Sequence, residues 1–353
     1  MMKKNLAIVI AKSGVALLDL LPHEWEVVVA DYSRLDQREV QWWSRPARKH
    51  YDEIIIVDQN ITTALTQRKL EQELRVMGVE GPVRYGGNPK SVLGYRHMEY
   101  LLTKEGLVPK PSMEPPSDIY RLNRYMIALV GLPAAGKTLL RHIFSRLPGF
   151  SVYKWGKFLR STVEGLYGPM TYENGWSVAM RFTNEVESKD RIVVAKTFLA
   201  AQEVREDPAS FMVVDGIKSR EQIIYASYAL RRPAIIVRVQ RDEEERRSEA
   251  RKRGDFDDVN DSERLEVLRK MGAIDVMSFA DFVVETTGCA TEYDAEKRGC
   301  RIQFTERFIA GMHEVLSWIF VSGSPEQTRE LVCNAAREVA QARGYAAETE
   351  VTP

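Results

Sequence analysis

An octapeptide near the middle of the chain constrains its fold more than any other feature. Residues 131–138 read GLPAAGKT, which is the pattern G-x-x-x-x-G-K-T. The apolar run Tyr125–Val130 comes directly before it, and the apolar-periodic segment Leu139–Leu147 comes directly after it. A strand, a glycine-rich turn and a helix in this order let backbone N–H groups wrap around phosphate oxygens. The sequence therefore predicts a phosphate-binding loop in an α/β domain.

Each residue type in this loop has a chemical reason. The glycines let the backbone approach phosphate oxygens closely, and the start of the new helix adds a positive dipole. Lys137 would reach the β- and γ-phosphates of a nucleoside triphosphate, and the Thr138 hydroxyl would ligate its Mg²⁺. We therefore expect ATP and Mg²⁺ as cofactors. The expected contacts are Gly131, Pro133, Ala134, Ala135, Gly136, Lys137, Thr138 and Leu139.

A carboxylate follows a second buried strand. The run FMVV at Phe211–Val214 ends in Asp215 and Gly216. Alone, this pair is typical of a turn, but beside a phosphate loop it is typical of a magnesium carboxylate. Asp215 would hold the ion, directly or through water, or act as a base on the acceptor.

An arginine-rich segment follows a third strand, Ile235–Val239. Arg247 and Arg251 are spaced i, i+4, so they share one face of a helix. The intervening acidic residues allow a salt-bridged solvent helix. The alternative is a lid whose arginines neutralise charge on the transferring phosphoryl group, with Arg247 favoured over Arg251 and then Arg253.

The first part of the chain alternates apolar strands with helical segments, which favours a parallel α/β sheet. Asp31 and Asp58 come where strands end, the usual edge for ligands in such sheets, although both are more typical of loop or capping carboxylates. The residues 86–89, GGNP, are expected to form a turn. No role for this half can be inferred from its residues.

Composition excludes several classes of protein. Lys plus Arg and Asp plus Glu both number 50, so nucleic-acid binding would need a local basic surface. The three cysteines, Cys289, Cys300 and Cys333, favour reduced thiols over a disulfide framework. No apolar run approaches the roughly 20 residues that span a bilayer. We expect a soluble cytoplasmic protein, in the host cytoplasm if it is viral, without a membrane partner.

Residues from about Tyr125 to Gly288 resemble the nucleoside-monophosphate-kinase-like P-loop kinases, in particular their dephospho-CoA-kinase-like and thymidylate-kinase-like branches. The resemblance implies a parallel-sheet kinase fold and phosphoryl transfer from Mg-ATP. The motifs that carry it are GLPAAGKT at 131–138, GKFLR at 156–160, TYENG at 171–175, VVDGIKSREQ at 213–222, the arginine-rich segment from Arg241, and SFADFVVETTG at 278–288.

The resemblance also implies acceptor ligands. By their positions in these motifs, Arg160, Lys218 and Arg220 would face the acceptor. Members of this branch commonly have an acidic residue after the glycine of the second motif. Lys157 stands there instead, which leaves the identity of the acceptor open.

The expected organisation has four parts. Four prolines between Pro109 and Asp118 favour an extended linker. After Ile302, a stripe of apolar residues at helical spacing favours core packing. The predicted parts are a Rossmann-like α/β domain at 1–108, a proline-rich linker at 109–120, a P-loop kinase domain with a parallel sheet at 121–300, and C-terminal helices and tail at 301–353.

The additional domain suggests a large acceptor. Similar enlarged kinases of bacteriophages phosphorylate the hydroxymethyl group of 5-hydroxymethyluracil within DNA. Basic residues between Arg34 and Lys49, interleaved with Trp42 and Trp43, would suit a polymer, as would Arg121 and Arg124. A free nucleoside monophosphate or a dephospho-CoA-type molecule is the alternative acceptor. A protein of another class, a regulator that senses ATP, is the third possibility.

Overall fold

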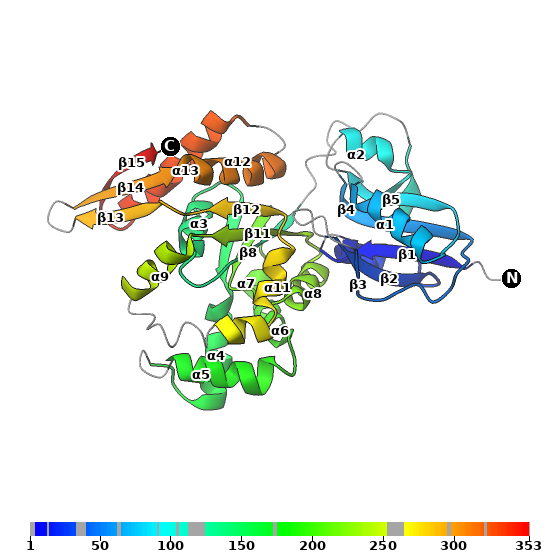
Figure 1. Ribbon diagram of the computed structural model, residues 1–353, viewed down its shortest axis with the longest axis horizontal. Coiled ribbons are helices and arrows are strands. Elements are labelled where there is room, and N and C mark those ends of the chain that lie inside the picture. Colours follow the sequence, from blue (N-terminus) through cyan, green and yellow to red (C-terminus); the bar gives the residue numbers. More distant parts are fainter. Residues whose placement is uncertain are drawn as a thin grey trace. The chain divides into compact units, whose positions relative to one another are not determined.

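The computed structural model describes most of the chain, in two units (Figure 1). The described ranges are 4–12, 14–32, 40–61, 65–89, 92–103, 106–111, 124–171, 175–252, 265–294, 298–320 and 323–352. One unit comprises 1–126 with 223–235, and the other comprises 127–222 with 236–353. Most of the predicted linker and the basic residues Arg34, Arg121 and Arg253 lie outside the described ranges. Within those ranges, every helix is too short or too polar to span a bilayer.

The first unit contains a seven-stranded sheet with the order β3-β2-β1-β4-β5-β6-β7. The neighbouring strands from β2 to β6 pair in parallel, whereas β3 and β7 pair antiparallel at the two edges. This arrangement confirms the predicted parallel α/β sheet. The elements are β1 (Asn5–Ile10), η1 (Gly14–Leu20), β2 (Glu26–Asp31), β3 (Gln41–Trp42), β4 (Glu53–Ile61), α1 (Leu65–Val76), β5 (Val83–Pro89), α2 (Val92–His97), β6 (Tyr100–Thr103) and β7 (Gly106–Pro109).

Both faces of this sheet are covered, which explains its continuous apolar strands. Alternate residues of β1 enter different clusters: Leu6 and Ile8 pack with Leu70 and Leu74 of α1. Their neighbours in β1 and β4 pack instead with residues of η1, a 3₁₀ helix, in a cluster of Ala7, Val9, Val15, Leu17, Leu21, Ile55 and Val57. The period-2 alternation of side chains thus places one helix on each face.

The predicted turn at 86–89 is wrong, because these residues belong to β5. Gly87 pairs with Asp58 of β4 at φ +149°, and a Cβ on it would lie 1.7 Å from the Asp58 carbonyl oxygen. Glycine is therefore required by the close approach of two strands, not by a turn. Asp31 and Asp58 are both buried at this sheet, and Gln67 Nε2 donates to Asp58 Oδ2 at 3.4 Å.

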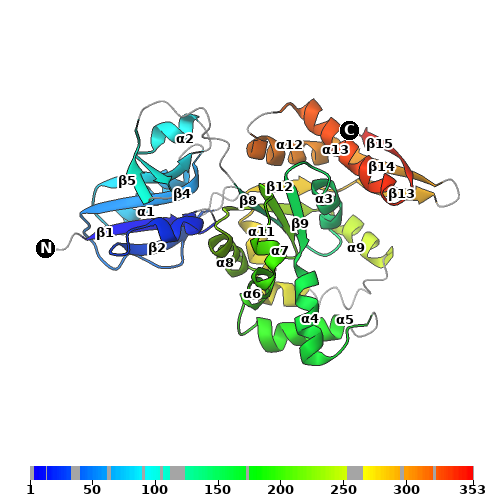
Figure 2. The ribbon, with the colours of Figure 1, turned by 180° about the vertical axis from the view of Figure 1, so that it is seen from behind.

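The second unit contains a five-stranded, all-parallel sheet with the order β12-β11-β8-β10-β9. All six residues of its central strand β8 are buried. Helix α3 packs against β9 and β10 (Figure 2). The strands are β8 (Tyr125–Val130), β9 (Phe150–Lys154), β10 (Phe211–Asp215), β11 (Ala234–Gln240) and β12 (Phe282–Glu285).

Helices connect these strands, as parallel pairing requires. Five helical elements lie between β9 and β10, far more than one crossover needs, and three of them, α4, α5 and η2, supply most of the cavity described below. The helices are α3 (Lys137–Phe144), α4 (Trp155–Tyr167), α5 (Gly175–Phe182), the π-helix η2 (Thr183–Glu187), α6 (Val193–Ala200), α7 (Gln202–Arg205), α8 (Arg220–Leu230), α9 (Glu243–Lys252) and α11 (Ala273–Ser278).

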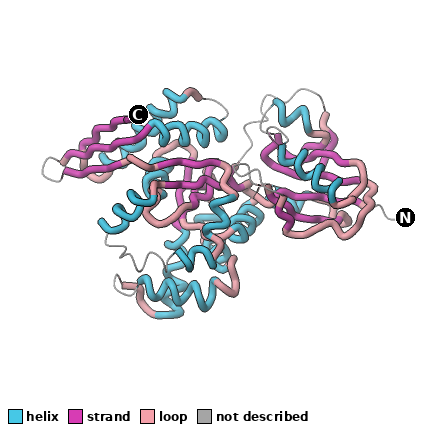
Figure 3. The backbone as a smooth tube through the Cα atoms, viewed as in Figure 1, coloured by secondary structure: helices cyan, strands magenta, loops and turns pink. Residues whose placement is uncertain are grey.

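The C-terminal segment is helical as predicted, but it also contains a sheet that was not predicted (Figure 3). Helices α12 (Glu306–Phe320) and α13 (Pro325–Gln341) accompany the strands β13 (Ala290–Asp294), β14 (Gly299–Thr305) and β15 (Ala346–Thr352). Phe304, the first residue of the predicted helical stripe, lies in β14. Phe308, Met312 and Leu316 are buried as expected.

Candidate active site

The loop 131–136 joins β8 to α3 in a conformation that few residue types can adopt. Its backbone has φ +154° at Gly131, +60° at Ala134 and +95° at Gly136. A Cβ on Gly131 would lie 2.3 Å from the Val239 carbonyl oxygen, and one on Gly136 would lie 2.8 Å from the Thr286 side chain. The two motif glycines are therefore required by positive φ and by close packing. All the residues predicted to bind phosphate lie in this loop or the first turn of α3.

Thr286, which the sequence analysis did not single out, follows β12 and stabilises the loop through hydrogen bonds. Its buried hydroxyl contacts the carbonyl oxygens of Ala135 at 2.8 Å and Gln240 at 3.1 Å. It thereby connects the loop to the ends of β11 and β12. The available signal was its position directly after the apolar run FVVE, at the carboxyl edge where ligand sites form.

Lys137 is the first residue of α3 and lies beneath the loop. Its Nζ donates to the carbonyl oxygens of Gly131 at 2.6 Å and Leu132 at 2.8 Å. Burial lowers the pKa of this amine to about 8; the Asp215 carboxylate opposes the shift, and the Arg246 guanidinium adds to it. A triphosphate would restore the counter-charge that the buried ammonium lacks.

Asp215 ends β10 as predicted, and it has an unexpected partner. Arg141 lies one turn after Lys137 on α3, and its Nη1 is 3.0 Å from Asp215 Oδ2. The sequence reasoning missed Arg141, although its i, i+4 spacing from Lys137 places both on one helix face.

Thr138 and Asp215 carry side-chain oxygens of the kind that Mg²⁺ prefers and would be its ligands. Among the described residues, no group of three or more His, Cys, Asp and Glu side chains could hold a metal alone. A nucleotide-bound Mg²⁺ needs only one or two protein oxygens, since phosphates and water complete its shell. The residues present therefore fit this ion.

On α9, the arginine that contacts the phosphate loop is Arg246. Its side chain is 1% exposed, and its Nη1 donates to the Pro133 carbonyl oxygen at 3.4 Å. Glu243 holds the guanidinium through bonds of 2.8 and 2.9 Å, and the pKa of that carboxyl is lowered to about 2, mainly by the Arg246 hydrogen bond. Arg247 and Arg251 lie on the exposed side of α9, so their lid role remains a prediction.

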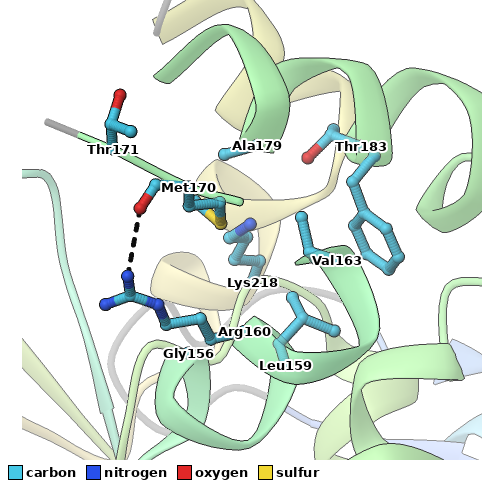
Figure 4. A pocket seen from close by; sticks show the side chains of 10 residues that line it. Gly156, Leu159, Arg160, Val163, Met170, Thr171, Ala179, Thr183 and Lys218 are labelled. Atoms are coloured by element: carbon cyan, nitrogen blue, oxygen red, sulfur yellow. Dashed lines mark hydrogen bonds between the residues drawn. The ribbon is translucent and has the colours of Figure 1, made fainter. Parts of the chain in front are cut away.

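A cavity of about 450 Å³ is lined by residues of α4, α5 and η2 and by Lys218, which belongs to the loop that follows Asp215 (Figure 4). Two of the three predicted acceptor residues, Arg160 and Lys218, line it. Arg220 does not: its guanidinium lies 3.6 Å from the centre of the Phe279 ring and 3.8 Å from Asp275. The lining residues are Gly156, Leu159, Arg160, Val163, Met170, Thr171, Ala179, Phe182, Thr183 and Lys218.

A second cavity, of about 520 Å³, adjoins the phosphate loop itself. Leu132 and Ala135 form its loop side, and Gln240, Arg241 and Thr287 contribute from the ends of β11 and β12. This position suits the nucleoside of a triphosphate whose phosphates lie in the loop.

No family model matches the sequence, and no curated protein matches it. Among solved structures, shikimate kinase from Acinetobacter baumannii is 16% identical, with a TM-score of 0.33, over 58% of this chain and 98% of that one. TT1252 from Thermus thermophilus is 15% identical, with a TM-score of 0.36, over 57% and 100%. A sugar kinase from Janibacter sp. HTCC2649 is 14% identical, with a TM-score of 0.20, over 36% and 67%. At these scores the likeness decides nothing about activity, so the functional case depends on this chain's own residues.

Proposed function

We propose that this chain is a kinase that transfers the γ-phosphoryl group of Mg-ATP to a nucleotide-like acceptor. The observation that carries the proposal is the loop between β8 and α3. In it, two glycines at positive φ frame the turn, and Lys137 is buried within electrostatic reach of Asp215 at the end of the neighbouring strand. A phosphate loop beside a strand-end carboxylate is the arrangement that phosphoryl transfer uses.

The donor side supplies cations and oriented N–H groups. Lys137 and Arg246 would stabilise the charge of the β- and γ-phosphates, and the start of α3 would add its dipole. Thr138 and Asp215 would hold Mg²⁺, which neutralises charge on the phosphates when bound. The nucleoside would occupy the cavity that Leu132, Arg241 and Thr287 line.

The finer proposal concerns the acceptor, for which we favour the hydroxymethyl group of 5-hydroxymethyluracil in phage DNA. The cavity near Asp215, at about 450 Å³, would accommodate a flipped base. In the first unit, Trp43 is 42% exposed and Arg45 and Arg48 are exposed, which would suit stacking and phosphate contacts. A free nucleoside monophosphate or a dephospho-CoA-type molecule is the competing acceptor.

The test is transfer of label from γ-labelled ATP to three acceptors offered separately. These are a DNA duplex containing 5-hydroxymethyluracil, a pool of deoxynucleoside monophosphates, and dephospho-CoA. We expect label in the DNA. Label only in a small molecule would support the kinase activity but contradict DNA as the acceptor. ATP binding without transfer to any of them would favour an ATP-sensing regulator instead.

Substitutions on α9 separate a kinase from a regulator. In a kinase, Arg247→Ala and Arg251→Ala should lower turnover while ATP affinity changes little, because a lid acts mainly on the transferring group. A regulator would keep its response in both variants. Arg205→Ala on α7 is the matched control, since Arg205 is also an exposed helical arginine but lies outside α9.

A further inference from the structure

The cavity near Asp215 contains two cations, and each already has a carboxylate partner. Among its described lining residues, only Arg160 and Lys218 carry a charge. Arg160 Nε lies 2.9 Å from Glu164 Oε1, and Arg160 Nη2 donates to the Met170 carbonyl oxygen at 3.0 Å. The pKa of the Glu164 carboxyl is lowered, mainly by the Arg160 hydrogen bond. Of this pair, Arg160 lines the cavity.

The partner of Lys218 is a buried carboxylate on an unusual helix. Glu187 is 3% exposed and lies on the π-helix η2, where Ser188 N donates to Thr183 O at 2.9 Å. Lys218 Nζ lies 3.5 Å from Glu187 Oε2, and Thr183 Oγ1 donates to the same oxygen at 3.4 Å. Such π-turns are rare and often occur at functional sites.

A glutamine fixes this pair in place. Gln222 Nε2 donates to Glu187 Oε1 at 2.9 Å, while its own Oε1 accepts the backbone N–H of Lys218 at 2.9 Å. Gln222 thus connects η2 to the loop that follows Asp215. The Lys218 amine is therefore held at the cavity, next to a carboxylate that also accepts hydrogen bonds from Gln222 and Thr183.

Most of the remaining wall is apolar, apart from Thr171 and Thr183. Leu159, Val163, Met170, Ala179 and Phe182 line the cavity, and Figure 4 shows the Lys218 amine among the side chains of Met170 and Val163. A phosphate dianion gains most where cations outnumber the carboxylates beside them. Here the charges of the described lining residues and their partners sum to zero, and the buried Glu187 would repel an added anion.

We propose that the group entering this cavity is uncharged: a flat ring that carries a hydroxyl, and not a phosphorylated nucleotide. The inference depends on the proposed kinase activity and selects among its acceptors. The ring would pack on the apolar wall, and the Lys218 amine and the Thr183 hydroxyl would bind its polar edge.

The transfer balances with this acceptor. The hydroxyl oxygen forms a bond to the γ-phosphorus of ATP, and the bond from that phosphorus to the β,γ-bridging oxygen breaks. ADP leaves with that electron pair, and the hydroxyl proton passes to solvent. The product is a phosphate monoester of the ring compound.

The test uses two ligands that differ only by a phosphate, 5-hydroxymethyl-2′-deoxyuridine and its 5′-monophosphate. The phosphate loop is first saturated with a non-hydrolysable ATP analogue and Mg²⁺, so that the monophosphate cannot bind there. Calorimetry on the full chain then measures each affinity. We expect the nucleoside to bind and the added phosphate to bring no gain. A monophosphate bound about tenfold tighter than the nucleoside, or no binding of the nucleoside, overturns the proposal.

A short DNA containing 5-hydroxymethyluracil distinguishes a ring that belongs to a polymer from one that belongs to a free molecule. Tighter binding of the DNA than of the nucleoside assigns the ring to a polymer, and the reverse assigns it to a free molecule. Either result keeps the uncharged acceptor. Because binding of the ATP analogue is measured first, its loss would count against the proposed kinase rather than against this inference.

A charge change provides a second, independent test. Glu187→Gln removes the carboxylate but keeps its size, so Lys218 becomes uncompensated and the affinity for the 5′-monophosphate should rise roughly tenfold. Glu185→Gln is the matched control: Glu185 lies on the same π-helix but pairs with Arg181, outside the cavity. Equal effects of the two variants on this affinity would contradict the proposed role of Glu187.

Discussion

The phosphate loop and the cavity that Arg160 and Lys218 line belong to the same unit, yet they are built in opposite ways. The loop is made of backbone, and its shape depends on φ at Gly131 and Gly136. The cavity is made of side chains from α4, α5, η2 and the loop after β10. Around the loop, three cations, Lys137 and Arg141 of α3 and Arg246 of α9, have two carboxylate partners, Asp215 and Glu243, so a positive charge remains that suits an anion. The cavity contains cations already matched by carboxylates. One site is therefore suited to phosphate, whereas the other is suited to a neutral group.

The largest expected effect comes from removing the Lys137 amine at the phosphate loop. Lys137→Ala should reduce phosphoryl transfer at least a hundredfold, because the amine that stabilises the transferring charge is lost. Labelled-ATP transfer measures the effect, and a thermal melt checks that the fold persists. Lys69→Ala on α1 of the first unit is the control. Near-normal transfer in Lys137→Ala would remove the kinase assignment.

Backbone shape gives the next largest effect. Gly136→Ala places a Cβ 2.8 Å from Thr286 at φ +95°, so ATP affinity should fall about tenfold or more and stability by about 1–3 kcal/mol. Gly165→Ala is the matched control, because a Cβ there meets nothing within 4 Å and the residue is in α4. Equal effects of the two substitutions in nucleotide titrations would refute a backbone-built loop.

The protonation of Lys137 gives a smaller, graded effect. Only the ammonium form attracts phosphate, and its pKa is about 8. The affinity for ATP should therefore be constant below this pH and fall above it, by at most about tenfold per pH unit. Titrations from acidic to alkaline pH measure it. Lys137→Arg keeps its charge at every pH tested and should lack the decline. An identical decline in that variant would assign the titration to another group.

The smallest expected effect concerns the ion pair between Arg141 and Asp215. A double-mutant cycle of Arg141→Gln and Asp215→Asn should give a coupling of about 1–2 kcal/mol in urea unfolding, because both groups are largely buried. The exposed pair Arg75–Glu71 should give about 0.5 kcal/mol or less. Coupling energies of equal size would show that burial does not strengthen the pair beside the phosphate loop.

Sequence alone sufficed for the loop, because its chemistry depends on strict local spacing. The glycines, Lys137 and the flanking strand and helix are adjacent in the chain. Strands β8, β10 and β11 were predictable from their apolar runs, whereas the end of β5 at 86–89 was predicted as a turn and β9 was not predicted. Asp215 was predictable because a buried strand ends there.

Other features depend on long-range packing that local spacing does not encode. The face of α9 that meets the loop was not evident, so Arg246 was overlooked in favour of Arg247. Arg220 matched a motif position, but stacking on Phe279 turns it away from the cavity. The sheet of β13, β14 and β15 joins residue 299 to residue 346, a pairing that periodicity cannot reveal. Glu187 belongs to no motif and acquires its role only through burial.

The hydroxyl of Thr286 has one hydrogen and two carbonyl oxygens within reach, those of Ala135 and Gln240. It can donate a full hydrogen bond to only one of them at a time. A bond to Ala135 holds the phosphate loop in place, whereas a bond to Gln240 holds the end of β11 and leaves the loop freer to adjust around a ligand. Thr286→Val removes both hydrogen bonds, so we expect the loop amides to exchange their hydrogens with solvent faster than in the native chain, while those of β8 keep their protection.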